Sequence, residues 1–270
     1  MAGEPGWLPS EADIKRANPA RVYDYLLGGT DNYLADQDVA RALIAIEPRS
    51  REIARANRAF LGRAVRYLAT AGVRQFLDIG SGIPTQGNVH EVAQQARPGA
   101  RVLYAEVDPI AIAQSQALLA GNEHAAIIEA DLREPQGILT HPDIGRFVDL
   151  GEPVGLLLAS VVHFLADDDD PWRIVATLRD ALAPGSYLVL SHATSEGRPE
   201  LIRAAEKVYN RSVSTPAYAR SRAEILRLFD GFDLIDPGLV YVPWWRPDSA
   251  ADLPGDSEPF GSLAGVARKP

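Results

Sequence analysis

The sequence predicts an α/β protein in which a mostly parallel sheet of seven strands follows an N-terminal helical segment. Up to residue 70 the apolar residues recur at helical spacing. After Gly72 short apolar runs alternate with helical stretches, which is typical of β-α-β units on a parallel sheet. A loop rich in Pro, Gly and Asp joins the last two runs, which favours a terminal antiparallel hairpin. We therefore expect a helical cap over residues 1–70 and a sheet domain over residues 71–270.

Three helices are expected before the sheet. An Asn-Pro pair predicts the start of a helix over residues 20–27, and the glycine pair that begins at Gly28 predicts its end. Thr30 or Asp31 is expected to cap a second helix that extends to about residue 46. A third helix is predicted over residues 50–70, where the apolar side chains share one face.

The apolar runs after Gly72 predict strands, and the segments between them predict helices. Strands are expected over residues 75–79, 102–107, 126–129, 154–162, 186–191, 239–242 and 262–267. Helices are expected over residues 88–97, 110–121, 135–140, 171–182 and 221–229. Most of the strand runs are almost continuously apolar, as expected for strands that are buried on both faces of a sheet.

The composition excludes several kinds of chemistry. The chain of 270 residues contains no cysteine, which excludes disulfides, thiolate zinc sites, iron–sulfur clusters and a cysteine nucleophile. Its net charge of −9 disfavours binding to nucleic acid, because phosphates require basic partners. No run approaches the roughly 20 apolar residues that span a bilayer, and residues 1–10 lack the pattern of a secretory signal. We expect a cytoplasmic protein that binds a small molecule and no membrane, and its oligomeric state stays open.

A strand that leads directly into a glycine-rich turn is the most informative segment. Residues 76–85 read FLDIGSGIPT, with Gly80, Ser81 and Gly82 in the turn before a helix. Glycines at such a turn allow a bound nucleoside to approach the backbone closely. The dinucleotide fingerprint has a third glycine at the position of Thr85, so this chain departs from that pattern. A tight turn without a ligand is the alternative interpretation.

Acidic residues follow the next two predicted strands. Glu106 follows Gly80 at close to the distance of about 20 residues that is expected for a ribose-binding carboxylate. Asp108 precedes a proline and is expected to cap a helix. Asp131 can accept a hydrogen bond from an adenine amino group while Leu132 covers the ring; a solvated loop acid is the alternative. Because open α/β sheets bind ligands at the carboxyl ends of their strands, these residues are expected to share one crevice.

Histidines and aspartates near the later strands have mostly structural interpretations. His163 follows a buried strand and is expected to pack or to gate. The four acids of residues 167–170 are expected to form a solvated loop that caps a helix, rather than a metal site. His192, at the carboxyl end of the fifth strand, is the candidate general base. No Gly-x-Ser-x-Gly occurs, so a nucleophile elbow is not predicted.

The chain resembles a known family over nearly its whole length. The glycine turn, the acids after the second and third strands and the run VVHFL at residues 161–165 resemble class I methyltransferases. More specifically, RVYDYLLGGTDNY at residues 21–33, WRP at residues 245–247 and GVARKP at residues 265–270 resemble the S-adenosyl methyltransferase family of actinomycetes. The resemblance implies a Rossmann-like class I methyltransferase sheet and S-adenosyl-L-methionine as cofactor, but no particular acceptor.

The resemblance also implies roles for the residues of the crevice. Asp78, Gly80 and Gly82 would face the methionine end of the cofactor, Glu106 its ribose, and Asp131 with Leu132 its adenine. Ser81, Val107 and Ser160 complete the cofactor-binding set in the sheet domain. The turn continues as Gly-Ile-Pro-Thr, which departs from the commoner Gly-x-Gly pattern of the family.

The corner at Gly28 has two interpretations. It is either a helix C-cap between two packed helices or part of a lid over the cofactor. In the second interpretation Tyr25, Gly28, Asn32 and Tyr33 contact the cofactor, because a plain connector needs no such aromatic and amide side chains. A DNA-binding helix-turn-helix is disfavoured by the aspartates between residues 24 and 38, which would repel phosphates.

The sequence therefore predicts an S-adenosylmethionine-dependent methyltransferase for a small-molecule acceptor, in which transfer relies on proximity and orientation. A non-catalytic protein that binds S-adenosylmethionine or S-adenosylhomocysteine is one alternative. A nicotinamide-dependent oxidoreductase is another, which Thr85 disfavours. Arg211, Arg220 and Arg222 lie near aromatic residues, which favours a planar acceptor with a carboxylate; pairing of the basic residues with neighbouring glutamates on exposed helices is the alternative.

Overall fold

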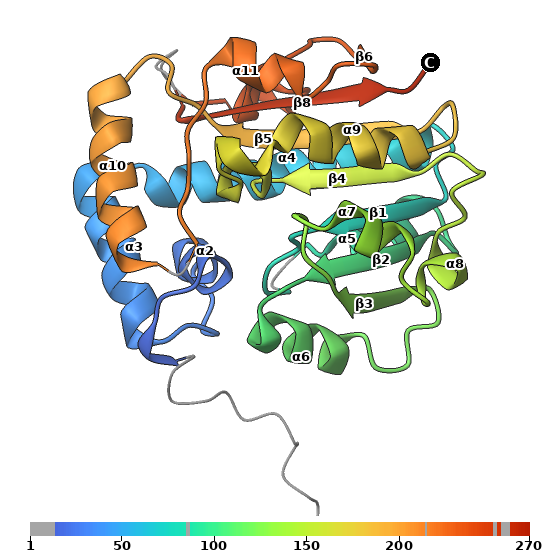
Figure 1. Ribbon diagram of the computed structural model, residues 1–270, viewed down its shortest axis with the longest axis horizontal. Helices are drawn as coiled ribbons and strands as arrows, with labels where there is room; N and C mark the ends of the chain where they lie inside the picture. The colour runs from blue at the N-terminus through green and yellow to red at the C-terminus, as the bar shows by residue number, and fades with distance from the viewer. Residues whose placement is uncertain (1–13, 85–86, 214, 251–252, 255–259) are drawn as a thin grey trace, which may run out of the picture.

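The computed structural model describes residues 14–84, 87–213, 215–250, 253–254 and 260–270. Within these residues an eight-stranded sheet has the order β3-β2-β1-β4-β5-β8-β6, and β7 also pairs with β8. Its strands are β1 (Gln75–Ile79), β2 (Arg101–Glu106), β3 (Ala125–Glu129), β4 (Gly155–Ala159), β5 (Tyr187–Ala193), β6 (Asp233–Leu234), β7 (Val240–Tyr241) and β8 (Ser262–Arg268). Helices cover both faces of this sheet (Figure 1).

The strand directions confirm the predicted fold class. Strands β1 to β5 are parallel, and β8 runs antiparallel to β5. The predicted terminal hairpin is present, since β7 pairs with β8 and places Val240 opposite Ala264. The short strand β6 pairs with the other end of β8 and adds an eighth strand, within the described residues, to the seven that the sequence predicts.

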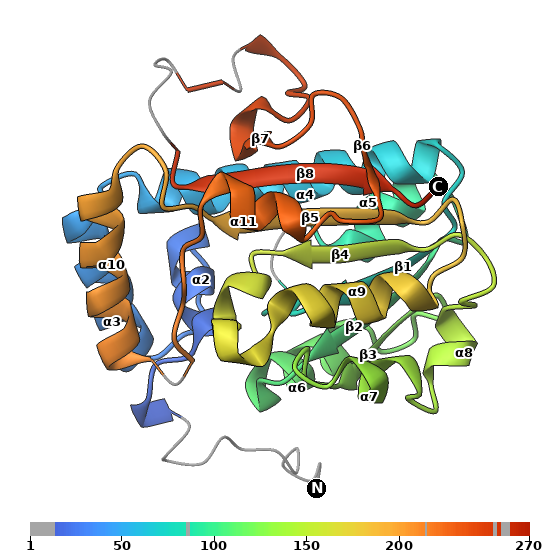
Figure 2. The same cartoon turned by 45° about the horizontal axis from the view of Figure 1, so that its top comes forward.

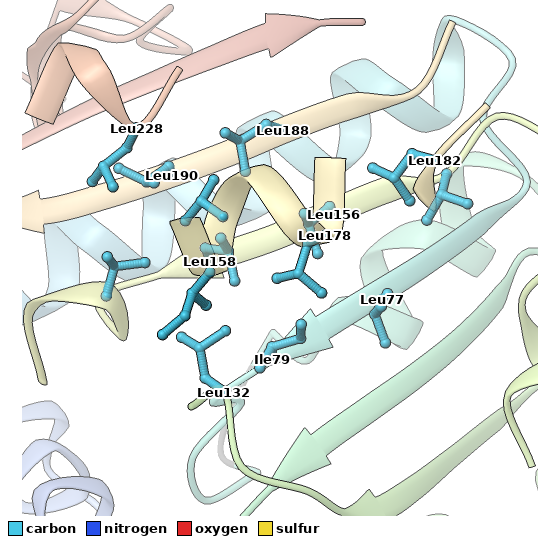
Figure 3. Packing of buried hydrophobic residues seen from close by; sticks show 14 of the residues in the cluster. Leu77, Ile79, Leu132, Leu156, Leu158, Leu178, Leu182, Leu188, Leu190 and Leu228 are labelled. Carbon is cyan, nitrogen blue, oxygen red and sulfur yellow. The ribbon is translucent and has the colours of Figure 1, made fainter. Parts of the chain in front are cut away.

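Two helical layers sandwich the sheet. The helices that pack near it are α4 (Ser50–Thr70), α5 (Val89–Ala96), α6 (Pro109–Leu118), α7 (Pro135–Leu139), α8 (Ile144–Phe147), α9 (Pro171–Ala181) and α11 (Arg222–Arg227). Neighbouring residues of β1 face opposite layers, because side chains alternate along a strand. Leu77 packs in one core cluster with Leu178 of α9 (Figure 3), whereas Phe76 packs in the other with Phe60 of α4.

The first helices form close to where the sequence predicts them. Helix α2 (Pro19–Leu27) begins where the Asn18 side chain accepts a hydrogen bond from the Ala20 amide at 2.8 Å, and it ends at Gly28, whose φ is +91°. Helix α3 (Leu34–Ile46) starts later than predicted, and the expected cap by Thr30 or Asp31 is wrong. Tyr33 is the cap residue instead, and its backbone amide donates to the Asp36 carboxylate at 2.8 Å. The helix therefore begins at Leu34.

A group of three helices stands at one end of the sheet (Figure 2). It consists of α2, α3 and α10 (Pro199–Ser212), which share a small apolar cluster that includes Val22, Val39 and Tyr209. Helix α10 is absent from the predicted elements. Helix α4, which is predicted as part of the N-terminal cap, packs with the strands. The three helices that stand apart from the sheet therefore come from two parts of the chain: α2 and α3 precede the first strand, and α10 follows β5.

Arg21 attaches this group to the sheet domain. Its guanidinium is buried and lies 3.0 Å from Asp36 of α3 and 3.0 Å from Asp108. Asp108 also accepts the amides of Ile110 and Ala111 and so caps α6, as the sequence predicts. Because a buried charge is stable only when it is paired, these contacts fix α2 against the carboxyl end of β2.

Candidate functional site

A cavity of about 390 Å³ lies between the carboxyl ends of the parallel strands and the helices of the cap. The turn after β1, the ends of β2, β3 and β4, and helices α2, α4 and α10 all contribute to its wall. Open α/β sheets bind ligands at this edge. The cavity is therefore the candidate site.

The turn after β1 brings backbone against the cavity. Gly80 has φ of +71°, and a Cβ there would overlap the side chain of Val161. Gly82 has φ of +67°, and the atom nearest to an added Cβ is Cβ of Ala20 in α2, at 3.9 Å. Both positions favour glycine. Ser81 between them has an enclosed Oγ with no hydrogen-bond partner among the described residues; Thr85 lies outside those residues.

Glu106 at the end of β2 is held rigidly. Its Oε2 accepts the Gly82 amide at 2.8 Å, and its Oε1 accepts the amides of Val107 at 2.7 Å and Asp108 at 3.1 Å. Burial raises the pKa of Glu106, while these three amides act in the opposite direction. The carboxylate thus connects β2 to the glycine turn and keeps about one of its four lone-pair sites available for a ligand.

Asp78 in β1 is a buried carboxyl group on the cavity wall. Asp78 is only 4% exposed, and burial raises the pKa of its carboxyl group to about 7. The nearby guanidinium of Arg58 in α4 lowers this pKa, and the negative charge of Glu106 raises it. An ammonium group placed in the cavity would favour the ionised form of Asp78.

The ends of β3 and β4 complete the sheet side of the cavity. Asp131 accepts the Arg133 amide at 2.8 Å and remains partly exposed, beside the buried Leu132. Ser160 follows β4 with φ of +56°, a strained conformation for a residue with a side chain. Its Oγ lies 3.3 Å from Oγ of Ser191, which donates to Asn57 of α4 at 2.6 Å.

The structure brings together the residues that the sequence assigns to the sheet part of the site. One cavity is lined by Asp78, Gly80, Ser81, Gly82, Glu106, Val107, Asp131, Leu132 and Ser160. They come from four different strand ends. Their convergence follows from the parallel order of the strands, which places all four carboxyl ends at one edge.

The residues predicted to form the lid lie elsewhere. Tyr25, Gly28, Asn32 and Tyr33 do not line the cavity. The Tyr25 ring lies 4.8 Å from the Arg51 guanidinium, the Tyr33 ring lies 5.6 Å from that of Arg21, and Asn32 donates to Asp24 at 2.8 Å. The Gly28 corner therefore has the structural role of a helix C-cap.

Helix α2 instead reaches the cavity through a different face. Ala20, Val22, Tyr23 and Leu26 line it. The Tyr23 hydroxyl donates to the Ala54 carbonyl at 2.9 Å and accepts from Asn57 at 3.0 Å. Sequence reasoning missed these residues, although the apolar spacing of Val22 and Leu26 is the signal that marks a buried helix face.

His192, the general base that the sequence suggests, lies away from the cavity. It is fully buried and does not line the cavity. Its Nδ1 lies 2.7 Å from the Ala193 carbonyl oxygen, and Nη1 of Arg220 lies 3.0 Å from its Nε2. Burial lowers the pKa of His192 well below its ordinary value, with His163 and Arg220 adding to this effect. Both ring nitrogens are therefore engaged by the protein itself.

His163 lies on the cavity wall instead. It belongs to the short helix η1 (Val162–Phe164), and its ring contacts those of Phe164 and His192 at centroid distances of 4.4 and 5.6 Å. Its Nδ1 has no hydrogen-bond partner among the described residues. Burial and the Arg220 cation lower the pKa of His163 to about 4, so the ring is neutral at physiological pH.

The arginines predicted to bind an acidic acceptor do not line the cavity. Arg211 is exposed on α10, and Arg222 pairs with Glu196 at 3.2 Å. Arg220 is buried and donates to the Leu165 carbonyl and to Asp167, at 2.8 and 2.7 Å. Arg220 and Arg222 thus pair with acidic residues, but these partners are distant in the sequence and are not the neighbouring glutamates of the alternative interpretation.

The run of four aspartates has the structural role that its sequence favours. Asp170 caps α9 by accepting the Arg173 amide at 3.1 Å, and Asp169 accepts the Ala166 amide at 2.8 Å. In the part of the chain that the structure describes, no group of His, Asp and Glu is arranged to hold a metal ion. The same part contains no helix with the length and apolar character required to cross a membrane.

Comparison with known proteins identifies the family. The pattern of the S-adenosyl methyltransferase family matches residues 5–270. The chain belongs to the S-adenosyl methyltransferase family. S-adenosylmethionine is therefore its cofactor, and the predicted resemblance is confirmed. None of the curated proteins matches the chain.

Two solved structures of the same overall fold are similar along the whole chain. A candidate methyltransferase from Thermobifida fusca is 40% identical, with a TM-score of 0.90 over 98% of this chain and 99% of that one. A DUF574 family protein from Streptomyces avermitilis is 41% identical, with a TM-score of 0.91 over 96% and 99%. The mitomycin 7-O-methyltransferase MmcR, at 19% identity and a TM-score of 0.52 over 93% and 69%, shares the fold alone.

Proposed function

We propose that this S-adenosyl methyltransferase family member is an active enzyme that transfers the methyl group of S-adenosylmethionine to a small-molecule acceptor in the cavity beneath α2 and α10. The observation that carries the proposal is that the glycine turn, the strand-end acids and an apolar helical wall line one continuous cavity. A cofactor site that opens into a second, apolar compartment is the arrangement that transfer between two bound molecules requires.

The strand-end residues fit the methionine end of this cofactor. The enclosed Oγ of Ser81 lacks a partner among the described residues and is suited to donate to the methionine carboxylate. Asp78 is suited to the methionine ammonium, since a cation would offset the burial that raises its pKa. The glycines at positions 80 and 82 leave the backbone accessible between these two groups.

The remaining residues fit the nucleoside. Glu106 is fixed by three amides and retains about one lone-pair site, which can accept a hydrogen bond from a ribose hydroxyl. Val107 lines the cavity and is 49% exposed. A bound nucleoside would cover this apolar side chain. Asp131 and Leu132 are suited to contact the adenine, and Ser160 lines the same cavity at the end of β4.

The acceptor compartment is mostly apolar. Phe164 follows β4, and Leu201, Ile202 and Tyr209 belong to α10. Bound S-adenosylmethionine supplies a methyl group on a positively charged sulfur. The chain contributes by holding the acceptor in line with this group and by excluding water, and orientation alone can supply roughly 7–11 kcal/mol. No ionised histidine is needed in this account.

Calorimetry and turnover together test the proposal. S-adenosylmethionine and S-adenosylhomocysteine should bind to the purified chain, and NAD should not. A library of small aromatic and aliphatic acceptors, screened for formation of S-adenosylhomocysteine above the rate without acceptor, should contain at least one substrate. Binding without turnover across the library would leave a non-catalytic binding protein, and binding of NAD in place of S-adenosylhomocysteine would overturn the cofactor assignment.

A further inference from the structure

Glu206 occupies an unusual place on α10. Ile202, Ala205 and Tyr209 face the cavity from the same side of this helix, at the spacing of three and four residues that defines one helix face. Glu206 lies within this apolar face and lines the cavity with them. Glu206 is partly exposed, but a carboxylate among the apolar side chains of a cavity wall is unfavourable unless a partner stabilises its charge.

Several other carboxylates of the cavity lie near a cation or accept backbone amides. Glu47 lies 2.7 Å from the Arg198 guanidinium, Asp131 lies 3.3 Å from that of Arg133, and Asp78 is influenced by the nearby Arg58. Glu106 accepts three backbone amides. Glu206 forms no ion pair with any described residue, so at the α10 side of the cavity its negative charge has no cationic partner from the described protein.

A structural role explains one carboxylate oxygen of Glu206 but not its charge. Oε1 of Glu206 accepts the Ala219 amide at 2.6 Å and thereby holds the segment that follows α10. A neutral side-chain oxygen would serve the same amide equally well. The contact therefore explains an oxygen at this position but not a charge.

Aromatic rings accompany the carboxylate. Tyr209 is one helical turn from Glu206, and its ring stacks with that of Phe164 at a centroid distance of 6.3 Å and an angle of 24°. Both rings line the cavity. A carboxylate beside aromatic faces in an apolar compartment is the environment that stabilises an organic cation.

We propose that the methyl acceptor is an apolar molecule with a protonated amine, and that Glu206 binds this amine. The inference rests on the proposed function, and it reverses the acidic acceptor that the arginines of the sequence suggest. The amine anchors the acceptor at α10, while the apolar part of the acceptor fills the compartment between Phe164 and the glycine turn.

The test compares three charge states of one ligand shape. Titration calorimetry on protein saturated with S-adenosylhomocysteine would use tryptamine, tryptophol and indole-3-acetate, and then phenethylamine, 2-phenylethanol and phenylacetate. In each series the amine should bind about tenfold or more tightly than the alcohol, because a charge-assisted hydrogen bond exceeds a neutral one, and the acid should bind most weakly.

Glu206→Gln removes the charge and retains an oxygen for the Ala219 amide. This variant should keep its melting temperature and its affinity for S-adenosylhomocysteine, but lose the preference for amines. Glu200→Gln, on the exposed face of the same helix, is the matched control and should keep the preference.

Three results would overturn the inference: equal binding of amine and alcohol by the unsubstituted protein, a preference that persists in Glu206→Gln, or a loss of S-adenosylhomocysteine affinity in that variant. Failure of S-adenosylhomocysteine to bind the unsubstituted protein would instead reject the proposed function, so the two failures are distinguishable.

Discussion

Replacing Asp78 by asparagine should stabilise the free protein and weaken cofactor binding at the same time. Burial raises the pKa of Asp78 from 3.8 to about 7. A difference of this size means that ionised Asp78 destabilises the fold by about 4 kcal/mol above pH 7, at 1.36 kcal/mol per pH unit. An unsatisfied buried amide would offset about 1–3 kcal/mol of the gain in Asp78→Asn, which leaves an expected net gain of about 1–3 kcal/mol.

The pH dependence gives this prediction its sign. Because the folded-state pKa lies above the unfolded value, the destabilisation is absent below pH 4, grows between pH 4 and 7, and is complete above pH 7. Urea unfolding of the cofactor-free protein at pH 4.5 and pH 8 should therefore show a gain for Asp78→Asn at pH 8 only. The exposed Asp168→Asn is the control and should change stability at neither pH.

Cofactor binding should respond in the opposite direction. The asparagine cannot pair with the methionine ammonium, so calorimetry should show weaker S-adenosylhomocysteine binding by Asp78→Asn, by about tenfold or more. An equal change in stability at both pH values, or a variant that is less stable at pH 8, would refute the assignment of a buried, destabilising carboxylate.

Three further predictions follow from the geometry. Gly80→Ala should lower S-adenosylhomocysteine affinity far more than Gly87→Ala. Both glycines have positive φ, but only at Gly80 would an added Cβ contact a neighbouring side chain. Equal losses of affinity in calorimetry would mean that backbone strain alone causes the loss. Arg21→Met should destabilise the protein by about 3–5 kcal/mol in denaturant unfolding, because it leaves two buried aspartates unpaired; a loss below 1 kcal/mol would contradict the anchoring role. The pKa of His163 in the folded protein is about 4, so this residue should lower the stability of the protein as the pH falls from 6.5 to 4. The stability of His163→Asn should therefore depend less on pH in this window, by about 1.4 kcal/mol per pH unit. An unchanged slope would show that the folded protein does not lower the pKa of His163.

The sheet part of the site could be predicted because it depends on local chain order. A strand that ends in glycine or in an acid places that residue at the carboxyl edge, and parallel strands bring those edges together. Gly80, Glu106 and Asp131 therefore share a cavity for reasons that are visible in the sequence. The cap of α6 by Asp108 is equally local.

The helical side could not be predicted because it depends on orientation and on distant partners. Tyr23 and Tyr25 differ by two residues, which is about 200° around a helix, so the two tyrosines of one motif lie on nearly opposite faces and only Tyr23 lines the cavity. His192 has a strand-end position that suits a base, yet Arg220, which lies on a segment beyond α10, occupies its second nitrogen. The sequence pattern contains no sign of that contact.

The packing of α10 against α3 is also a tertiary property. Its residues alternate between exposed charge and a narrow apolar face, which predicts a helix without saying what covers that face. Only the folded chain shows that Tyr209 packs with Val39 and that the same helix presents Glu206 to the cavity.

The affinity of the purified chain for S-adenosylhomocysteine tests the central claim most directly. Isothermal titration calorimetry should show one molecule bound per chain, with much weaker binding in Gly80→Ala and no heat from NAD under the same conditions. The absence of S-adenosylhomocysteine binding by the unsubstituted protein, or binding that Gly80→Ala leaves unchanged, would contradict the assignment of the cofactor to the cavity at the carboxyl ends of β1, β2 and β4.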